Sequence, residues 1–326
     1  MDRTIVVRAA QLRTAVYFPD LIEPVAQAFQ ASSAGHADSG LIVMFPAEQP
    51  EAGDVYVKSG TLRGHSIYII KVSPWFAANV DEQRPQGGFI GVFDSRTGHA
   101  LALLDDEHYL SDIRTAAAGS VAARALAPEH VDTALVVGSG VQAYWQPQAL
   151  HRERPYRKLL AWARNPDKTA ALAARLAPAL PDVDIEVVHD LEPAVRRADV
   201  ILTTTQAREP LIYGDWLHAG QHITAIGADD ATKCELDAAT LRRARVYVDA
   251  RDTARDTGEV HRAIRTGQYT LDDLAGELGQ VLAGTKSART SADDITVATL
   301  AGLGVQDLVA AEVALQKLAT TRTTAL

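Results

Sequence analysis

A glycine-containing turn between an apolar run and a helical stretch constrains the fold more than any other feature of this chain. The apolar run 134–137 leads into Gly138-Ser139-Gly140, and Ala143 completes the pattern Gly-x-Gly-x-x-Ala. In a dinucleotide-binding βαβ unit the first glycine permits a tight turn, and the second lets the backbone approach a pyrophosphate at the N-terminus of the next helix. Because a second apolar run, 158–163, stands at βαβ distance, we predict a nucleotide cofactor. An ordinary strand-to-helix turn is the alternative.

Composition excludes several classes of protein. A length of 326 residues predicts two domains, and a net charge of −9 without charge blocks argues against a general affinity for nucleic acid. The single cysteine, Cys234, rules out an intramolecular disulfide framework, and the histidines lack a metal-ligand spacing, so we predict no metal site. No apolar run approaches the ~20 residues of a membrane span, and Met1–Thr4 has no signal-peptide pattern. We expect a cytoplasmic protein without a membrane or nucleic-acid partner.

The pattern of strands and helices divides the chain in two. The first part is β-rich, and an alanine-rich helix with Ser111 as a possible N-cap leads out of it. Its expected strands are 41–45, 54–58, 66–72, 89–94 and 100–104, and its expected helix is 20–31. In the second part, expected strands at 134–137, 158–163, 185–188, 200–203, 223–226 and 246–248 alternate with helices.

This alternation predicts an α/β fold with a Rossmann-type doubly wound parallel sheet. The segment 302–318 is helical again and is expected to return to the first part. We therefore predict a β-rich α+β domain at 1–115 with 303–326, and a dinucleotide-binding domain at 116–302.

Three cations in the β-rich part need a reason for their positions. Lys71 and Lys58 each end an apolar strand, where a lysine either snorkels to solvent or is held for an anionic ligand. Arg114 is expected in the first turn of the alanine-rich helix, where the helix macrodipole disfavours a cation. It either pairs locally with Asp112 or binds a substrate carboxylate or a cofactor phosphate.

Asp229 is a candidate for proton transfer. It lies just beyond the expected strand 223–226, at the carboxyl edge where open α/β sheets bind ligands. The structural alternative is a helix cap or an Asx turn together with Asp230. Lys233 either pairs with Asp229 or reaches the same ligand.

The type of cofactor is argued from the end of the strand 158–163. Arg164 and Asn165 follow it, whereas NAD enzymes commonly have a carboxylate there for the ribose 2′-hydroxyl. This favours NADP(H), and NAD(H) stays possible because Asp167 could reach the ribose. Alternatively, Arg164 is only a solvated cation at a strand end.

Several motifs, in their order and spacing, resemble those of the ornithine cyclodeaminase and μ-crystallin family. They are Lys71-Val-Ser-Pro, Arg114-Thr-Ala-Ala-Ala-Gly, Gly138-Ser-Gly-Val-Gln-Ala, Ala225-Ile-Gly-Ala-Asp229-x-x-x-Lys233-x-Glu-Leu-Asp, Gly276-Glu-Leu-Gly-x-Val-x-Ala-Gly and Gly302-x-Gly-Val-Gln-Asp307. Two departures bear on the substrate: 41–45 has no arginine where true cyclodeaminases carry one, and 299–302 lacks their serine. Segments 54–58, 70–76 and 300–307 look closer to the ectoine-utilisation protein C branch, which is akin to iminosuccinate reductases.

The resemblance implies a homodimer whose β-rich domains pack together, and hydride transfer between NAD(P) and α-amino or α-imino acids. It implies that Lys71 and Arg114 bind the substrate carboxylate, that Asp229 donates or accepts the proton, and that Lys233 is a further active-site lysine. The positions that match cofactor contacts are Gly138, Ser139, Gly140, Val141, Gln142, Thr205, Ile226 and Gly227. Our remaining candidates are Lys58 and Ala301 for the substrate, and Arg114, Arg164 and Asn165 for the cofactor.

We therefore predict an NAD(P)H-dependent reductase of a small α-imino acid, which in reverse is an amino-acid dehydrogenase, with ectoine or hydroxyamino-acid catabolism as a candidate setting. One alternative is a redox-neutral ammonia-lyase of the ornithine cyclodeaminase type with bound NAD. Another is a non-catalytic NADP(H)-dependent binding protein of the μ-crystallin type.

Overall fold

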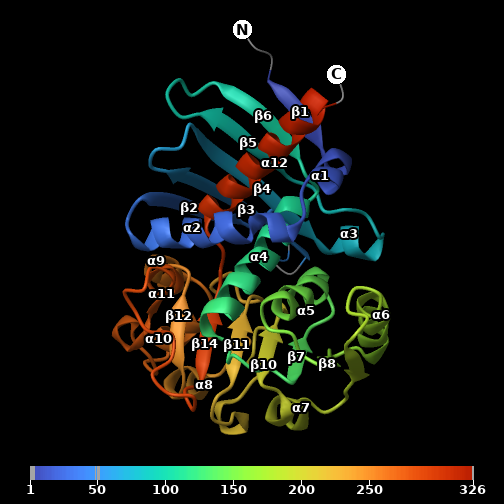
Figure 1. Ribbon diagram of the computed structural model, residues 1–326, viewed down its shortest axis with the longest axis vertical. Coiled ribbons are helices and arrows are strands. Elements are labelled where there is room, and N and C mark those ends of the chain that lie inside the picture. The colour runs from blue at the N-terminus through green and yellow to red at the C-terminus, as the bar shows by residue number, and fades with distance from the viewer. Residues whose placement is uncertain (1–3, 48, 50–51, 325–326) are drawn as a thin grey trace. The chain divides into compact units, whose positions relative to one another are not determined.

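The computed structural model describes residues 4–47, 49 and 52–324. The chain divides into two compact units (Figure 1): unit 1 comprises Met1–Ala117 and Leu303–Leu326, and unit 2 comprises Ala118–Gly302. The first boundary falls inside one helix, α4 (Tyr109–Leu126). Within the described residues, no helix combines the length and the apolar character needed to cross a membrane.

Unit 1 is built around a mixed six-stranded sheet. Its strands, in the order in which they lie side by side, are β1 (Ile5–Arg8), β6 (Ala100–Asp105), β5 (Phe89–Asp94), β4 (Ile67–Phe76), β3 (Gly53–Leu62) and β2 (Ala37–Met44). The strands β2 to β6 form an antiparallel meander, and β1 joins β6 in parallel. The helical segments are α1 (Ala9–Ala15), η1 (Phe18–Leu21), α2 (Ile22–Ser33), α3 (Ala77–Asp81), the first half of α4, and α12 (Gly304–Thr324).

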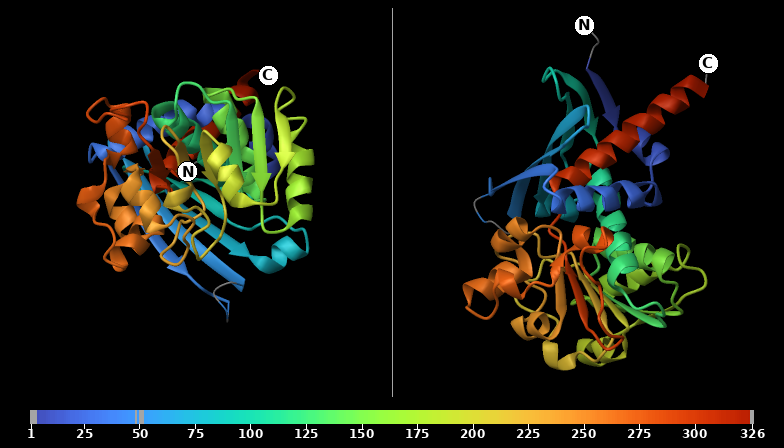
Figure 2. Two further views of the ribbon diagram at one scale, coloured as in Figure 1. Left: turned by 90° about the horizontal axis from the view of Figure 1, so that it is seen from below. Right: turned by 60° about the vertical axis from the view of Figure 1, so that its left-hand side comes forward.

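The helices α2 and α12 lie together across one face of this sheet (Figures 1 and 2). Alternate strand residues such as Ile69 and Leu104 are buried on that face. Residues at the opposite alternation, such as Ile70 and Leu101, point the other way and stay exposed. This period of two is the geometry of a half-buried strand, and it decides on which face each charged side chain of the sheet lies.

Unit 2 has the predicted doubly wound architecture. All strand pairs of its eight-stranded sheet are parallel. The order is β13 (Gly276–Glu277), β12 (Arg245–Val248), β14 (Thr296–Thr299), β11 (His222–Ala225), β10 (Val200–Thr203), β7 (Thr133–Val137), β8 (Lys158–Trp162) and β9 (Asp184–Val187). Its helical segments are the second half of α4, α5 (Val141–Glu153), α6 (Pro166–Leu176), α7 (Leu191–Arg197), η3 (Gly214–Trp216), α8 (Ala238–Arg243), α9 (Arg251–Asp256), α10 (Gly258–Arg265), η4 (Leu271–Asp273) and α11 (Leu278–Leu282).

Two apolar clusters fill the two faces of the parallel sheet. On β7, Val136 belongs to the cluster under α5 and α6, whereas the adjacent Leu135 and Val137 belong to the cluster under α7, α8 and α10. The chain runs from β7 outward to β8 and β9 and then returns to the other side of β7 at β10. Open α/β sheets bind ligands at such a switch point, beyond the carboxyl ends of the strands. The turn that follows β7 lies there.

The start of α4 corrects one sequence expectation. The helix begins at Tyr109, and the carboxylate of Asp106 accepts the backbone N–H of Leu110 at 3.0 Å, so Ser111 is not the N-cap. Arg114 therefore lies in the second turn. The prediction that it lies in the first turn, where the helix macrodipole disfavours a cation, is wrong. The strands β1, β13 and β14 were not expected either.

Candidate functional site

The sheet of unit 1 carries two lysines on its helix-covered face. Lys71 shares this face of β4 with the buried Ile67 and Ile69, as the alternation predicts, and only 3% of its surface is exposed. Lys58 of β3 lies directly opposite Lys71 in the register and is also buried. Snorkelling therefore accounts for neither lysine. Two ammonium groups that face each other across a ladder repel, so this face requires an anion.

A carboxylate of α12 supplies that anion. Oδ1 of Asp307 accepts hydrogen bonds from Lys71 Nζ at 2.9 Å and from Arg114 Nε at 3.0 Å. Arg114 also donates to Gln306 Oε1, and Lys71 also donates to the hydroxyl of Ser111. We expected Arg114 either to pair locally with Asp112 or to bind an anionic ligand. In these hydrogen bonds its partners are two residues of the C-terminal helix.

Burial and charge set the protonation of this cluster. Burial alone would raise the pKa of Asp307, but Arg114, Lys71 and Lys58 lower it to about 2. Burial lowers the pKa of Lys71, while the charge of Asp307 opposes that shift. The cluster is therefore a set of buried cations that is organised by one ionised carboxylate. Such a group of cations suits a ligand with a carboxylate, which Arg binds through two parallel N–H donors.

Three further titratable groups border this cluster at the start of α4. Burial raises the pKa of Asp106 to about 6, and burial together with Asp106 raises that of Asp112 to about 7. Burial and the nearby Lys71 lower the pKa of His108 to about 4. Nε2 of His108 lies 3.0 Å from Ser73 Oγ and from the carbonyl of Pro74. Near pH 7 His108 is therefore neutral, Asp106 is mostly ionised and Asp112 is about half ionised.

Asp307 and Ser111 were not among the sequence-predicted site residues. The motif that ends at Asp307 was recognised, but nothing in its spacing says that its carboxylate meets Lys71, which is 236 residues away in the chain. One signal was present: Asp307 stands among apolar residues in the first turn of a helix, on the buried face shared with Leu308. A carboxylate in that position needs a cationic partner.

In unit 2 the turn after β7 fits a dinucleotide. Gly138 has φ 129°, in the left-handed region that favours glycine, and its N–H donates to the carbonyl of Trp162. Gly140 is the N-cap of α5, and a Cβ placed on it would meet nothing within 4 Å. The backbone at the helix N-terminus is therefore open to a pyrophosphate. Ser139, Val141 and Gln142 lie in the same turn and the first turn of α5.

The loop after β11 separates the roles of two neighbouring aspartates. Asp230 forms the Asx turn, since its Oδ1 accepts from the backbone N–H of Thr232 and of Lys233. Asp229 is outside that turn, half-exposed, and its Oδ1 accepts from Lys233 Nζ at 2.6 Å. The structural alternative therefore applies to Asp230, and Asp229 presents a carboxylate at the carboxyl edge of the sheet.

A buried glutamate ties the ends of β10 and β11 together next to this loop. Oε1 of Glu235 accepts the N–H of Thr205 at 2.5 Å, and Oε2 accepts the N–H of Gly227 at 2.9 Å and the hydroxyl of Thr203 at 2.7 Å. A Cβ on Gly227 would lie 2.0 Å from the carbonyl oxygen of Thr205, so only glycine allows this approach. The arrangement fixes the predicted cofactor residues Thr205, Ile226 and Gly227 at one edge, and sequence reasoning did not find Glu235.

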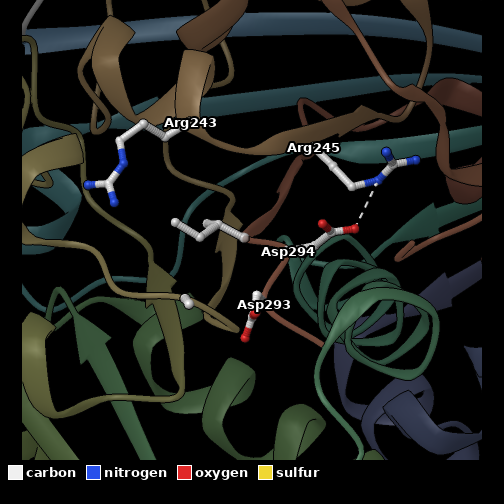
Figure 3. A pocket seen from close by; sticks show the side chains of 6 residues that line it. Arg243, Arg245, Asp293 and Asp294 are labelled. Atoms are coloured by element: carbon white, nitrogen blue, oxygen red, sulfur yellow. Dashed lines mark ion pairs between the residues drawn. The ribbon is translucent and has the colours of Figure 1, made fainter. Parts of the chain in front are cut away.

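A hollow of about 290 Å³ lies at the opposite, amino-terminal edge of the parallel sheet (Figure 3). Arg243 donates there to the carbonyls of Gly214 and Leu217, and Arg245 lies 3.7 Å from Asp294. Both arginines of this hollow therefore already interact with groups of the protein, and open α/β sheets bind ligands at the other edge of the sheet. It is therefore not a candidate active site.

Comparison with known proteins agrees with these features. The sequence profile of the ornithine cyclodeaminase/mu-crystallin family matches residues 3–321. The chain belongs to this family. An uncharacterized cyclodeaminase of Sinorhizobium fredii is 42% identical over 267 residues, 81% of this chain and 80% of the relative. The alanine dehydrogenase of Archaeoglobus fulgidus is 30% identical over 312 residues, 95% of this chain and 94% of the relative.

Three solved structures of the family have a similar fold. The Δ1-pyrroline-2-carboxylate reductase of Thermococcus litoralis, in complex with NADH and L-proline, has a TM-score of 0.91 at 25% identity and covers 98% of each chain. An archaeal alanine dehydrogenase dimer with bound NAD has a TM-score of 0.89 at 27% identity, covering 98% and 97%. The iminosuccinate reductase of Paracoccus denitrificans, in complex with NAD⁺, has a TM-score of 0.89 at 26% identity, covering 99% and 98%.

The remaining predicted residues of this family member lie in unit 2. Asn165 is the N-cap of α6, where its side chain accepts the N–H of Asp167 and of Lys168. Arg164 precedes it and is exposed at the end of β8. Ala301 is half-buried in the segment between β14 and α12. The contacts of these residues with a substrate or cofactor stay predictions, as does the approach of Arg114 to a cofactor.

Proposed function

We propose that this protein is an NAD(P)H-dependent reductase of a small α-imino acid, and that in reverse it acts as an amino-acid dehydrogenase. The observation that carries the proposal is the buried group of Lys58, Lys71 and Arg114 around Asp307, in a chain whose second unit has an open dinucleotide turn. Relatives that are named as reductases of imino acids or as amino-acid dehydrogenases support it. The dihydronicotinamide, when bound, supplies the hydride.

The residues have separate roles in this proposal. Lys71 and Arg114 bind the substrate carboxylate, with Lys58 as a further cation, and hold the C=N carbon in one orientation. Asp229 carries the proton that must reach the substrate nitrogen, and Lys233, which donates to its Oδ1, orients the carboxyl group. One hydride and one proton convert the imine to the amine. We propose that Ala301 lines the substrate site.

The cofactor is a nicotinamide dinucleotide, and we propose NADP(H) as the preferred form. Two observations support this: Arg164 is exposed just after β8, and Arg164 and Asn165 stand where NAD enzymes commonly have a carboxylate for the ribose. Asp167 lies in the first turn of α6 and would serve the ribose of NAD(H) instead. The ratio of kcat/KM for NADPH and NADH decides between the two.

We further propose a cytoplasmic homodimer that forms through the sheet of unit 1. On the face opposite α2 and α12, apolar side chains including Ile42, Ile70 and Leu101 are exposed. Several exposed apolar side chains on one face of a sheet are typical of an interface. The archaeal alanine dehydrogenase structure, which is a dimer, supports a second copy of this chain as the partner.

A reductase screen tests the proposed function. The substrates are imines formed in place from 2-oxo acids with ammonia, and cyclic imino acids, each with NADPH and with NADH. We expect NAD(P)H oxidation with at least one small α-imino acid, and loss of turnover in Asp229→Asn while cofactor binding persists. A parent enzyme that oxidises neither cofactor with any of these substrates would overturn the proposal.

A redox-neutral cyclodeaminase is the second candidate, because a relative 42% identical carries that description. NAD, if bound, would supply reversible hydride transfer in that reaction, so that a diamino acid would cyclise with loss of ammonia and without net change in the redox state of the cofactor. Ammonia release from ornithine or lysine without net change in NADH absorbance supports it. Stoichiometric consumption of NAD(P)H with an imino acid excludes it as the main activity.

A further inference from the structure

The C-terminal helix begins with a close contact that delivers two polar side chains to the cation cluster of unit 1. A Cβ on Gly304 would lie 1.9 Å from the carbonyl oxygen of Ser59 on β3, and a Cβ on Gly60 would lie 2.4 Å from the backbone of Gly304. Both positions therefore require glycine. Gln306 and Asp307 follow at once in the first turn of α12, and both are fully buried.

Each of these two side chains has one polar atom that does not take part in the hydrogen bonds with the cations. Asp307 uses Oδ1 for both Lys71 and Arg114, and its buried Oδ2 has no hydrogen-bond partner among the residues that the structure describes. Gln306 uses Oε1 for Arg114 Nη1 at 3.1 Å, and its buried Nε2 likewise has no partner within the described ranges. A carboxylate that served folding alone would be expected to satisfy both oxygens, because an unpaired buried acceptor costs about 1–3 kcal/mol.

We propose that Asp307 is a positioning residue of the carboxylate-binding site, which aims Lys71 and Arg114 through one shared oxygen. The proposal deepens the proposed function, on which it rests for the identity of the ligand. Asp307 acts through the two cations, and its single shared oxygen fixes the ammonium and the guanidinium relative to each other. The ligand class is a small α-imino or α-amino acid, bound through its carboxylate.

The charged surroundings of Lys71 make this role testable by pH. On the neighbouring strands, Lys58 of β3 and the apolar Ile90 of β5 lie opposite Lys71. The other charged or titratable groups that interact with it come from α4, from the segment before α4 and from α12. They are Arg114, Asp112, Asp106, His108 and Asp307. Burial already lowers the pKa of Lys71, and Asp307 opposes that shift. Without this negative charge, Lys71 would lose its proton at a lower pH.

The first test is the pH profile of kcat/KM for the imino acid in Asp307→Asn. Asparagine keeps the shape and removes the charge, so we expect the alkaline limb to move down by at least one pH unit, with KM for NAD(P)H within twofold of the parent. The matched control is Ser111→Ala, which removes a neutral hydrogen-bond acceptor of Lys71 and should leave the limb in place. A uniform loss of activity with an unshifted limb in Asp307→Asn would overturn the proposal.

The second test needs no turnover and separates this proposal from the proposed function. When the pKa of a lysine is lower in the folded protein than in the unfolded chain, the unfolded chain binds more protons between these two pKa values. Within this pH window the free energy of unfolding therefore increases as pH rises. In Asp307→Asn this window should begin at a lower pH. We therefore expect the gap in thermal midpoint between parent and variant to shrink between pH 7 and pH 10. A gap that stays constant contradicts the role for Asp307, whether or not an imino acid is turned over.

Discussion

Lys58 and Lys71 lie directly opposite each other on neighbouring strands, an arrangement that two ammonium groups disfavour. They are held there because Asp307 places a carboxylate in reach, with Arg114 as the third cation around it. Alternation along β4 predicted the face of Lys71 from the sequence. It could not predict the partner, since a strand pattern specifies a direction and not what another element brings to meet it.

Replacing Lys71 by methionine tests the cation cluster residue by residue. The variant keeps the apolar stem and loses the ammonium that pairs with Asp307 Oδ1. We expect kcat/KM for the imino acid to fall about 100-fold, mainly through KM, because removing one partner of a buried ion pair typically costs 2–5 kcal/mol. Steady-state kinetics at pH 7 gives the measurement. The control Lys168→Met removes an exposed lysine of unit 2 and should change neither constant. An unchanged KM in the Lys71 variant would remove this residue from the substrate site.

At the scale of elements, two glycines that each begin a helix are predicted to fail in different ways when changed to alanine. Gly140 opens onto free space at the start of α5, so Gly140→Ala should cost less than about 1 kcal/mol of unfolding free energy but weaken NAD(P)H binding at least tenfold. Gly304 meets the backbone of β3, so Gly304→Ala should cost about 1–3 kcal/mol.

Denaturant unfolding and fluorescence titration with NADPH measure both effects. The two variants control each other, because Gly304→Ala should retain the cofactor affinity of the parent within twofold. If Gly140→Ala bound NADPH as tightly as the parent, the turn after β7 would not be the pyrophosphate site.

The same elements show how far the sequence could predict the structure. Apolar runs found β5 and β10 at their observed bounds, and found the other predicted strands with errors at their ends. The two-residue β13 was missed because two residues show no period. The strands β1 and β14 were missed although they are as long as β10. The start of α4 was misplaced because Asp106, and not Ser111, satisfies its first turn. Glu235 was missed for a related reason: its three donors come from the ends of two strands that only the folded sheet brings together.

At the scale of the whole molecule, the sheet of unit 1 has apolar side chains exposed on one face. The sheet of unit 1 buries one face under α2 and α12, whereas Ile42 is 61% exposed and Ile70 of the central β4 is 38% exposed on the other face. If this face joins two copies, Ile70→Asp should convert a dimer to a monomer, since a carboxylate buried at the interface would lose its hydration. Sedimentation velocity gives the mass. Tyr213→Asp changes an exposed apolar residue of unit 2 and should leave the mass unchanged. A parent protein that sediments as a monomer at micromolar concentration would contradict the proposed dimer. If the parent is a dimer and Ile70→Asp stays dimeric, this face of the sheet is not the interface.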